Sequence, residues 1–238
     1  MTIRRISLTV LGFAGSALAA LMLCVSAHSI LSEPVAPAMI LEPEEIQFPY
    51  AIPNTGLIIQ SMTGYDGPFL EDGTDREVVN TAALSVHNTS DVLLESVKIN
   101  LNWAGGIYTF SGSYLPANGT AVLLEQNAQQ CQFIQFTHCA ATQTTAQFPP
   151  IDNDITVTEQ AMGTVILTNT TEDTICGVTI YYKTWLYTEN MYIGGITYAM
   201  DIADLQPGQT VCLYPEHYAV GYSKVTCIRG FSVKGNGQ

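Results

Sequence analysis

Residues 82–101 read AALSVHNTSDVLLESVKINL, and residues 163–182 read GTVILTNTTEDTICGVTIYY. The two stretches align without a gap at an offset of 81 residues, and each contains an Asn-Thr-Ser/Thr-Asp/Glu segment, starting at Asn88 and at Asn169. On both sides of this segment, apolar residues recur at every second position, which is the pattern of strands with one buried face. The stretches therefore predict the same strand–turn–strand unit twice.

A second match extends the repeat. Residues 115–122 (LPANGTAV) resemble residues 205–211 (LQPGQTV), at an offset of 90, so the second copy holds about nine additional residues, expected within 187–195. Short strands joined by Asn/Thr and Pro/Gly turns are typical of small antiparallel sandwiches. We predict an all-β fold with two tandem small immunoglobulin-like antiparallel β-sandwiches after an N-terminal apolar helix. A single fused sandwich is the alternative, because each copy is small for an independent core.

The repeat and the composition divide the chain into five predicted parts. In chain order they are a signal-anchor or signal peptide (1–27), a proline-containing stalk (28–64), a first β-sandwich (65–138), a linker (139–151) and a second β-sandwich (152–238). The stalk is predicted because closely spaced prolines disfavour a helix and stiffen an extended chain. Its prolines are Pro34, Pro37, Pro43, Pro49 and Pro53.

The amino terminus predicts export. Arg4 and Arg5 precede an uncharged run of 22 residues, 6–27, and basic residues before an apolar run are retained on the cytoplasmic side. The length of the run favours a retained anchor, whereas the small residues before and at Ala27 resemble a cleavage site. We expect a single-pass membrane protein with its C-terminal part outside, or a secreted protein if the chain is cleaved after Ala27.

The charge balance limits the partners. The chain has 21 acidic and 8 basic residues, a net charge of −13, and 47% hydrophobic residues. The apolar content suffices for a core, and the acidic balance argues against nucleic acid, which is bound mainly by clustered Lys and Arg. We expect contact with the membrane only through the N-terminal helix, and an envelope protein or a glycan as the partner.

Five cysteines follow the apolar run, and an outward-facing position favours their oxidation. Cys212 and Cys227 flank a segment that would place them opposite each other in a hairpin, so we predict a disulfide between them. Cys131 and Cys139 enclose a short loop and form the second predicted pair. Cys176 is then left over, either as an inert thiol or as a link between chains.

Two groups of residues are candidates for metal binding. Cys131, His138 and Cys139 combine two thiols with an imidazole, but their spacing is not that of a zinc ribbon. A cluster of five acids provides the oxygen ligands that calcium prefers, although it lacks the usual calcium-loop motif. The cluster consists of Asp66, Glu71, Asp72, Asp75 and Glu77. A solvated acidic loop is the alternative, and we expect no cofactor other than calcium.

Aromatic residues are dense in the second copy. Tyr187 and Tyr192 fall on the inserted segment, and Tyr181 falls on the strand face opposite to Tyr182, which should be buried. Exposed aromatic rings stack on sugars or anchor a protein partner, so Tyr181, Tyr187 and Tyr192 are the candidate partner-binding residues. Ordinary strand composition explains them equally simply, because tyrosine favours sheets.

Catalysis has little support in the sequence. A nucleophile, a base and an orienting group must converge, and no histidine of the chain lies in a recognisable motif. Gly105-Gly106 and Gly194-Gly195 are interpreted as isolated turn signals. We therefore predict that the protein is not an enzyme and has no catalytic residues.

Four longer strings carry a resemblance to a known group of proteins. They are GPFLEDGTDREV (67–78), LPANGTAVLLE (115–125), YIGGITY (192–198) and PEHYAVGYSKV (215–225). Over about residues 65–230 the chain resembles an uncharacterised family of exported, membrane-anchored β-sandwich proteins of Gram-positive anaerobic bacteria. The resemblance implies a location and a fold class, and it carries over no functional residues.

Together these observations predict a non-enzymatic extracytoplasmic envelope protein with a structural or protein-interaction role. The alternative is a surface module that binds a glycan or calcium, based on the aromatic and the acidic clusters.

Overall fold

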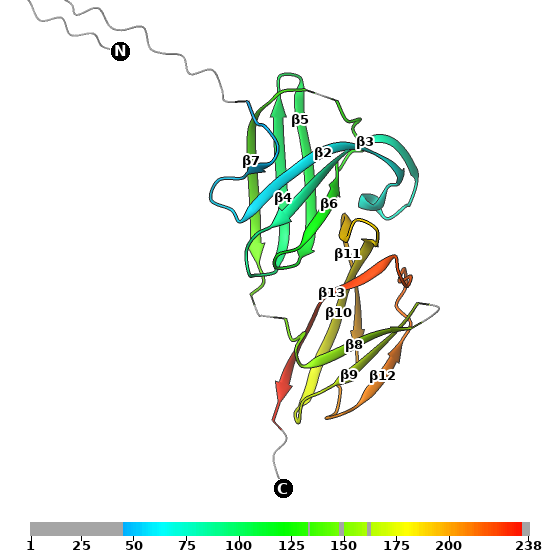
Figure 1. Cartoon of the computed structure of the whole chain (residues 1–238). Coiled ribbons are helices and arrows are strands. Elements are labelled where there is room, and N and C mark those ends of the chain that lie inside the picture. Colours follow the sequence, from blue (N-terminus) through cyan, green and yellow to red (C-terminus); the bar gives the residue numbers. More distant parts are fainter. Residues whose placement is uncertain (1–44, 133, 148–149, 161–162, 235–238) are drawn as a thin grey trace, which may run out of the picture. The chain divides into compact units, whose positions relative to one another are not determined.

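The computed structural model describes residues 45–132, 134–147, 150–160 and 163–234, and this part of the chain is all-β (Figure 1). It includes the short 3-10 helix η1 (Leu70–Asp72). The predicted N-terminal helix and residues 28–44 of the predicted stalk lie outside the described residues. The rest of that stretch, residues 45–64, contains strand residues, and its Ile52, Leu57 and Ile59 are buried. Within the described ranges, no helix is long and apolar enough to cross a membrane.

The described residues form thirteen strands. In chain order they are β1 (Tyr50–Ala51), β2 (Leu57–Pro68), β3 (Glu77–Asn88), β4 (Leu94–Trp103), β5 (Gly106–Leu115), β6 (Thr120–Leu124), β7 (Phe136–Thr145), β8 (Ile155–Gln160), β9 (Thr164–Asn169), β10 (Thr174–Leu186), β11 (Met191–Ile202), β12 (Thr210–Leu213) and β13 (Ser223–Val233).

The same pairing pattern occurs twice. In the first repeat, strands β2–β7, β3 pairs with β2 and β6, and β4 pairs with β5 and β7. In the second repeat, strands β8–β13, β9 pairs with β8 and β12, and β10 pairs with β11 and β13. All these pairs are antiparallel, so each repeat contains two three-stranded arrangements in the same order.

The register reproduces the two offsets of the sequence match. Val86 lies opposite Ala121 in the first repeat, and Leu167 lies opposite Val211 in the second. The hairpin pair Ile99 and Phe110 has its counterpart in Ile180 and Met200. One partner of each pair is displaced by 81 residues and the other by 90, so the additional residues of the second copy lie in the hairpin between β10 and β11.

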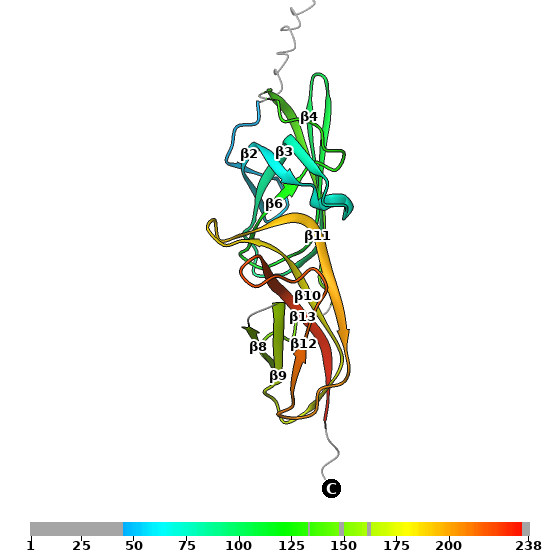
Figure 2. The same cartoon turned by 90° about the vertical axis from the view of Figure 1, so that its right-hand side faces the viewer.

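The alternating apolar residues form two cores. In the core of the first repeat, Leu84, Val86 and Ile99 are 0% exposed. In the core of the second repeat, Val165, Leu167 and Ile180 are also 0% exposed. Burial of one such side chain is worth about 1.5–3 kcal/mol, which makes these faces the main source of stability. In the second repeat this core lies between the sheet of β8, β9 and β12 and the strands β10 and β13 (Figure 2).

The Asn/Thr segments are buried turns. The side-chain amide of Asn88 donates to the carbonyls of Val92 and Pro116, both at 2.9 Å, and its oxygen accepts from Ser90. The side-chain amide of Asn169 likewise donates to the carbonyl of Asp173, at 2.8 Å, and to the carbonyls of Leu205 and Gln206. Both side chains are 0% exposed. Each asparagine therefore satisfies buried carbonyls that the turn would otherwise leave without a donor.

The two repeats share one sheet. Strand β11 pairs in parallel with β6, through Tyr192 opposite Ala121 and Ile193 opposite Val122. This contact joins strands of both repeats into a seven-stranded sheet with the order β1-β2-β3-β6-β11-β10-β13. The pairing residues of β11 belong to the additional segment of the second copy, so the insertion is the element that connects the copies.

Candidate functional site

The most elaborate polar site lies where β10 and β11 meet the first repeat, and we call it the junction. It is centred on Lys183 of β10, whose side chain is 1% exposed. The β10–β11 register shifts between Tyr182 and Thr184, so Lys183 lies at a bulge in the pairing. A bulge redirects a side chain out of the regular alternation, and here the redirected group is a lysine.

The Lys183 ammonium is surrounded by oxygen atoms. Its Nζ donates to the carbonyls of Gly195 at 2.9 Å and Ile196 at 2.8 Å, to the Ser113 carbonyl at 3.3 Å, and to Thr197 Oγ1 at 3.2 Å. Ser113 belongs to the first repeat, so the lysine bonds both copies. Buried ammonium groups require such acceptors, because removal from water costs several kcal/mol.

Glu71 is the acidic counterpart of Lys183. Its carboxylate, which extends from η1, accepts from the Gly195 amide at 2.8 and 2.9 Å and from the Leu124 amide at 3.0 Å. Burial raises the pKa of Glu71, while these amides and the Lys183 charge oppose the rise. Burial lowers the pKa of Lys183 to about 7, and the Glu71 charge opposes that shift. Each group thus stabilises the charged form of the other.

Further contacts cross between the repeats beside this pair. Thr197 Oγ1 donates to the Ser113 carbonyl at 3.0 Å, and the Tyr114 and Tyr181 rings stack with centroids 4.0 Å apart. The guanidinium of Arg229 forms an ion pair with Glu95. The junction therefore combines a strand pairing, a buried charged pair, a ring stack and a half-buried ion pair.

Glycine allows the close approach of the two repeats. A Cβ on Gly195 would lie 2.0 Å from the Ser111 carbonyl oxygen, and a Cβ on Gly194, whose φ is +79°, would lie 2.9 Å from Leu70 Cβ. The prediction that Gly194-Gly195 marks a turn is wrong, because both residues lie within β11. They are needed where the strand passes against the backbone of β5 and against η1.

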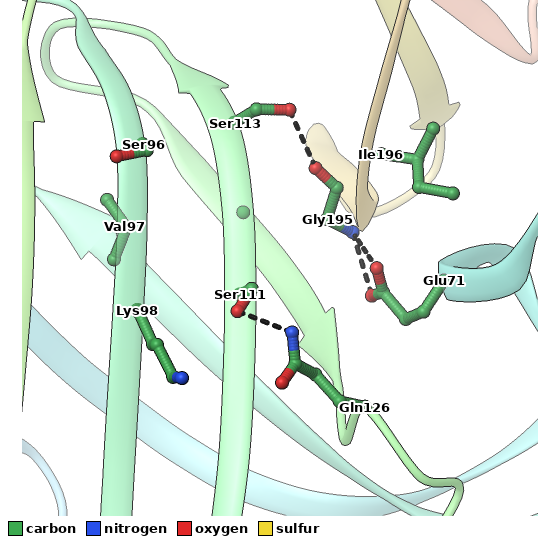
Figure 3. A pocket seen from close by; sticks show the side chains of 10 residues that line it. Glu71, Ser96, Val97, Lys98, Ser111, Ser113, Gln126, Gly195 and Ile196 are labelled. Carbon is green, nitrogen blue, oxygen red and sulfur yellow. Dashed lines mark hydrogen bonds between the residues drawn. The ribbon is translucent and has the colours of Figure 1, made fainter.

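A pocket of about 400 Å³ opens beside the junction (Figure 3). It is lined by polar groups of β4 and β5, among them Ser96, Lys98 and Ser111, and by Gly195 and Ile196 of β11. Gln126 Nε2 donates to Ser111 Oγ at 2.7 Å across its rim. Figure 3 shows the Glu71 carboxylate facing the Gly195 amide at one side of this pocket.

The five acids predicted as calcium ligands do not converge. Glu71 is used in the junction, Asp66 accepts from the Asn80 amide at 2.6 Å, and Asp72 accepts from Thr74 and pairs with Arg76. Asp75 and Glu77 complete the predicted set, and the described part of the chain brings together no group of three potential metal ligands. The carboxylates of Asp66, Glu71 and Asp72 are thus directed to separate partners, and the described residues show no preassembled calcium site.

The same finding applies to Cys131, His138 and Cys139. Both thiols are buried in the core of the first repeat, whereas His138 lies on an exposed position of β7. Alternate residues of a strand point to opposite faces, so the imidazole of His138 and the adjacent thiol of Cys139 are directed apart.

The predicted hairpin disulfide between Cys212 and Cys227 is wrong. Cys212 lies in β12 opposite Ile166, and Cys227 lies in β13 opposite Tyr181, so the two belong to different sheets. The intervening segment is a loop that crosses between sheets and does not form a hairpin turn. The structure also has Cys131, Cys139 and Cys176 as free thiols, so the second predicted pair is not formed either. Burial raises the pKa of the Cys139 thiol to about 11.

The three predicted partner-binding tyrosines have different environments. Tyr181 is half-buried in its stack with Tyr114, and Tyr192 is 6% exposed against Trp185. Tyr187 is 78% exposed, on the tip of the β10–β11 hairpin. It lines a pocket together with Tyr222, which the sequence analysis did not select. The neighbouring Gly221 is the sequence signal that favours a turn, and hence a surface position, for this tyrosine.

Comparison with known proteins gives no match: no protein-family model fits the chain, and no curated protein matches it.

Proposed function

We propose that this protein is an exported, membrane-anchored component of the cell envelope, with a structural or protein-interaction role and without enzymatic activity. In this proposal the two repeats are tandem immunoglobulin-like β-sandwiches, and the N-terminal segment attaches them to the membrane through the proline-containing stalk. The proposal follows the family resemblance in location, and the observation that carries it is the junction around Lys183.

The junction supports a structural role because it fixes one repeat against the other. Tandem domains joined only by a linker move relative to each other unless their interface is extensive. Here a continuous sheet, the Lys183–Glu71 pair and the Tyr114–Tyr181 stack all cross between the copies. A rigid two-repeat unit holds surfaces on both repeats at a fixed separation, which suits a scaffold or a binding protein.

The chemistry of the junction also favours such a role over catalysis. An active site directs convergent polar groups toward a substrate. In this protein the buried Lys183 and the partly buried Glu71 direct their donors and acceptors to backbone groups of the two repeats. Buried charged pairs contribute conformational specificity more than stability, and a specific arrangement of two domains is such a use.

The first test concerns location and partner. Full-length protein in its own cells would be fractionated, treated with external protease, crosslinked and then captured by affinity. We expect recovery with the membrane fraction, sensitivity to external protease, and one dominant crosslinked envelope component. Recovery in the cytoplasmic fraction, or turnover of a substrate from a hydrolase panel by the purified protein, would contradict the proposal.

Two lysine variants make this test specific for the junction. Lys183→Met removes the buried ammonium, whereas Lys98→Met removes an exposed lysine of β4. We expect Lys183→Met to reduce the yield of the crosslinked component and to increase amide exchange in β6 and β11. Lys98→Met should leave both unchanged. Equal crosslinking yields in the two variants would show that the fixed arrangement of the repeats is not needed.

A further inference from the structure

A second pocket lies at the end of the inserted hairpin, away from the polar groups of the junction. It has a volume of about 420 Å³ and is lined by Trp185, Leu186, Tyr187, Thr188, Gly221 and Tyr222. We call it the aromatic pocket. It is formed by the tip of the β10–β11 hairpin together with the loop that precedes β13.

The aromatic rings in this pocket have different roles. Tyr187 is 78% exposed and Tyr222 is 72% exposed, so both rings are available from solvent. Trp185 is 9% exposed and fixed in place: its ring meets Tyr192 edge-to-face with centroids 4.7 Å apart, and its amide donates to the Tyr222 carbonyl at 2.8 Å. A rigid buried ring beneath two exposed ones is the arrangement of a preorganised binding site.

We propose that the aromatic pocket binds a neutral oligosaccharide, with the rings of Tyr187 and Tyr222 stacking against sugar rings. The C–H groups on one face of a pyranose form an apolar, slightly positive surface. The face of an aromatic ring is negative, so it attracts such a surface while both are removed from water. The Thr188 hydroxyl, which lines the pocket and donates to the Glu189 carboxylate at the hairpin tip, is placed to bind a sugar hydroxyl.

The charges near this pocket do not favour an anionic ligand. The ammonium of Lys224 lies 4.3 Å from the centroid of the Trp185 ring, and this cation–π contact engages it. Glu189 is the next charged residue at the hairpin tip, and the chain as a whole carries a net charge of −13. A phosphate or carboxylate polymer would meet repulsion here, whereas a neutral sugar meets none.

The backbone around the pocket argues against an extended peptide that adds a strand. Leu186 pairs with Met191, the Trp185 amide donates to Tyr222, and Tyr192 pairs with Ala121 of β6. These groups are occupied by the hairpin and the junction, so recognition in this pocket must come from side chains. Stacking on exposed rings is the side-chain mode that remains.

This inference deepens the interaction role proposed above, and it rests on the proposed location outside the cell. The test uses purified full-length protein with Trp103→Phe, which leaves Trp185 as the only fluorescent tryptophan. Its emission is titrated with three neutral hexasaccharides, namely chitohexaose, cellohexaose and maltohexaose. We expect at least one to change the Trp185 emission with saturation in the micromolar to millimolar range.

Three tyrosine variants locate the binding. Tyr187→Ser and Tyr222→Ser should each weaken binding roughly fivefold, because one stacked ring contributes that order of affinity. Tyr214→Ser is the matched control, since Tyr214 is 70% exposed but does not line this pocket. It should bind as the parent protein does. Because all three residues are exposed, their replacement should leave the fold intact.

Two results would overturn the inference. One is the absence of saturable binding for all three hexasaccharides. The other is binding that Tyr187→Ser and Tyr222→Ser leave unchanged. Neither result bears on the junction, whose test depends on amide exchange and crosslinking, so failure here and failure of the proposed function are distinguishable.

Discussion

The β4–β5 and β10–β11 hairpins show how two similar repeats came to differ. Both begin with the same register, Ile99 opposite Phe110 and Ile180 opposite Met200. The first hairpin then closes at once, at Trp103 and Gly106. The second continues to Leu186 opposite Met191, and its extension pairs with β6. The cores are therefore conserved between the copies, and the divergence lies where the copies touch.

The same comparison applies to one side chain. Lys183 and Asn102 occupy equivalent positions at the offset of 81 residues. Asn102 is half-buried, whereas Lys183 is 1% exposed because the first repeat covers it. A half-buried position near the end of a strand in one repeat thus corresponds to a buried position at the contact between the repeats.

The largest expected effect tests the equivalence of the cores. Ile99→Ala and Ile180→Ala each remove a side chain that is 0% exposed. Each should lower the free energy of unfolding by about 4 kcal/mol, through lost burial and the cavity that remains. Denaturant unfolding of the full-length protein measures both. Losses that differ by much more than about 1 kcal/mol would show that the two cores are not equivalent.

The next effect concerns the junction. Lys183→Met should lower the free energy of unfolding by about 3 kcal/mol, because it leaves the Glu71 carboxylate buried without its cation. Adding Glu71→Gln should recover part of the loss, because the uncharged side-chain oxygen of glutamine can still accept from the backbone N–H of Gly195. Lys98→Met should change stability by less than about 0.5 kcal/mol. A double variant less stable than Lys183→Met alone would argue against the charge pairing.

Equivalent glycines give a smaller contrast. Gly195→Ala should cost about 2 kcal/mol, because its Cβ would lie 2.0 Å from a backbone oxygen that cannot move freely. Gly105, its counterpart at the offset of 90, would meet the Trp103 ring instead. Gly105→Ala should cost below about 1 kcal/mol, because an exposed turn can relax. Thermal or denaturant unfolding compares the two, and equal costs would contradict a close approach specific to the junction.

The smallest effect is the pH dependence contributed by Lys183. Its pKa is lowered to about 7 in the folded protein from 10.5, so between these values the unfolded chain binds a proton that the folded chain does not. Stability therefore rises with pH in this window. Relative to Lys183→Met, the wild type should gain about 1 kcal/mol between about pH 7 and 8. A difference that is flat or falls with pH would show that the ammonium keeps its ordinary pKa.

The all-β fold could be predicted from the sequence because apolar and polar residues alternate along individual segments of the chain. Alternation at residues such as Val97, Ile99 and Leu101 identifies the buried face without knowledge of any partner strand. The matched Asn88 and Asn169 identify the turns, and the change of offset locates the insertion. These signals act over a few residues, or compare two segments of one chain.

The junction could not be predicted, because it depends on contacts between distant segments. Glu71 and Gly195 are 124 residues apart, and nothing near either residue indicates the other. In the sequence, Lys183 lies next to a core residue, as a residue on a solvent-exposed strand face would. It is buried because the first repeat covers that face, and this contact is not visible in the local sequence. The misassigned Cys212 and Cys227 have the same cause, since a loop that changes sheets resembles a hairpin in sequence.

The buried turns also bear on how this protein can be produced. Asn88 and Asn169 each begin an Asn-x-Ser/Thr acceptor sequence, yet their side-chain nitrogens are occupied by backbone carbonyls. A eukaryotic secretory host that attached glycans there before folding would block both turns and trap the chain unfolded. Asn118, in the third such sequence, is exposed and would accept a glycan without this conflict. Folded protein should therefore be obtained from that host only if Asn88 and Asn169 stay unglycosylated. Glycosylation of Asn118 should not prevent folding.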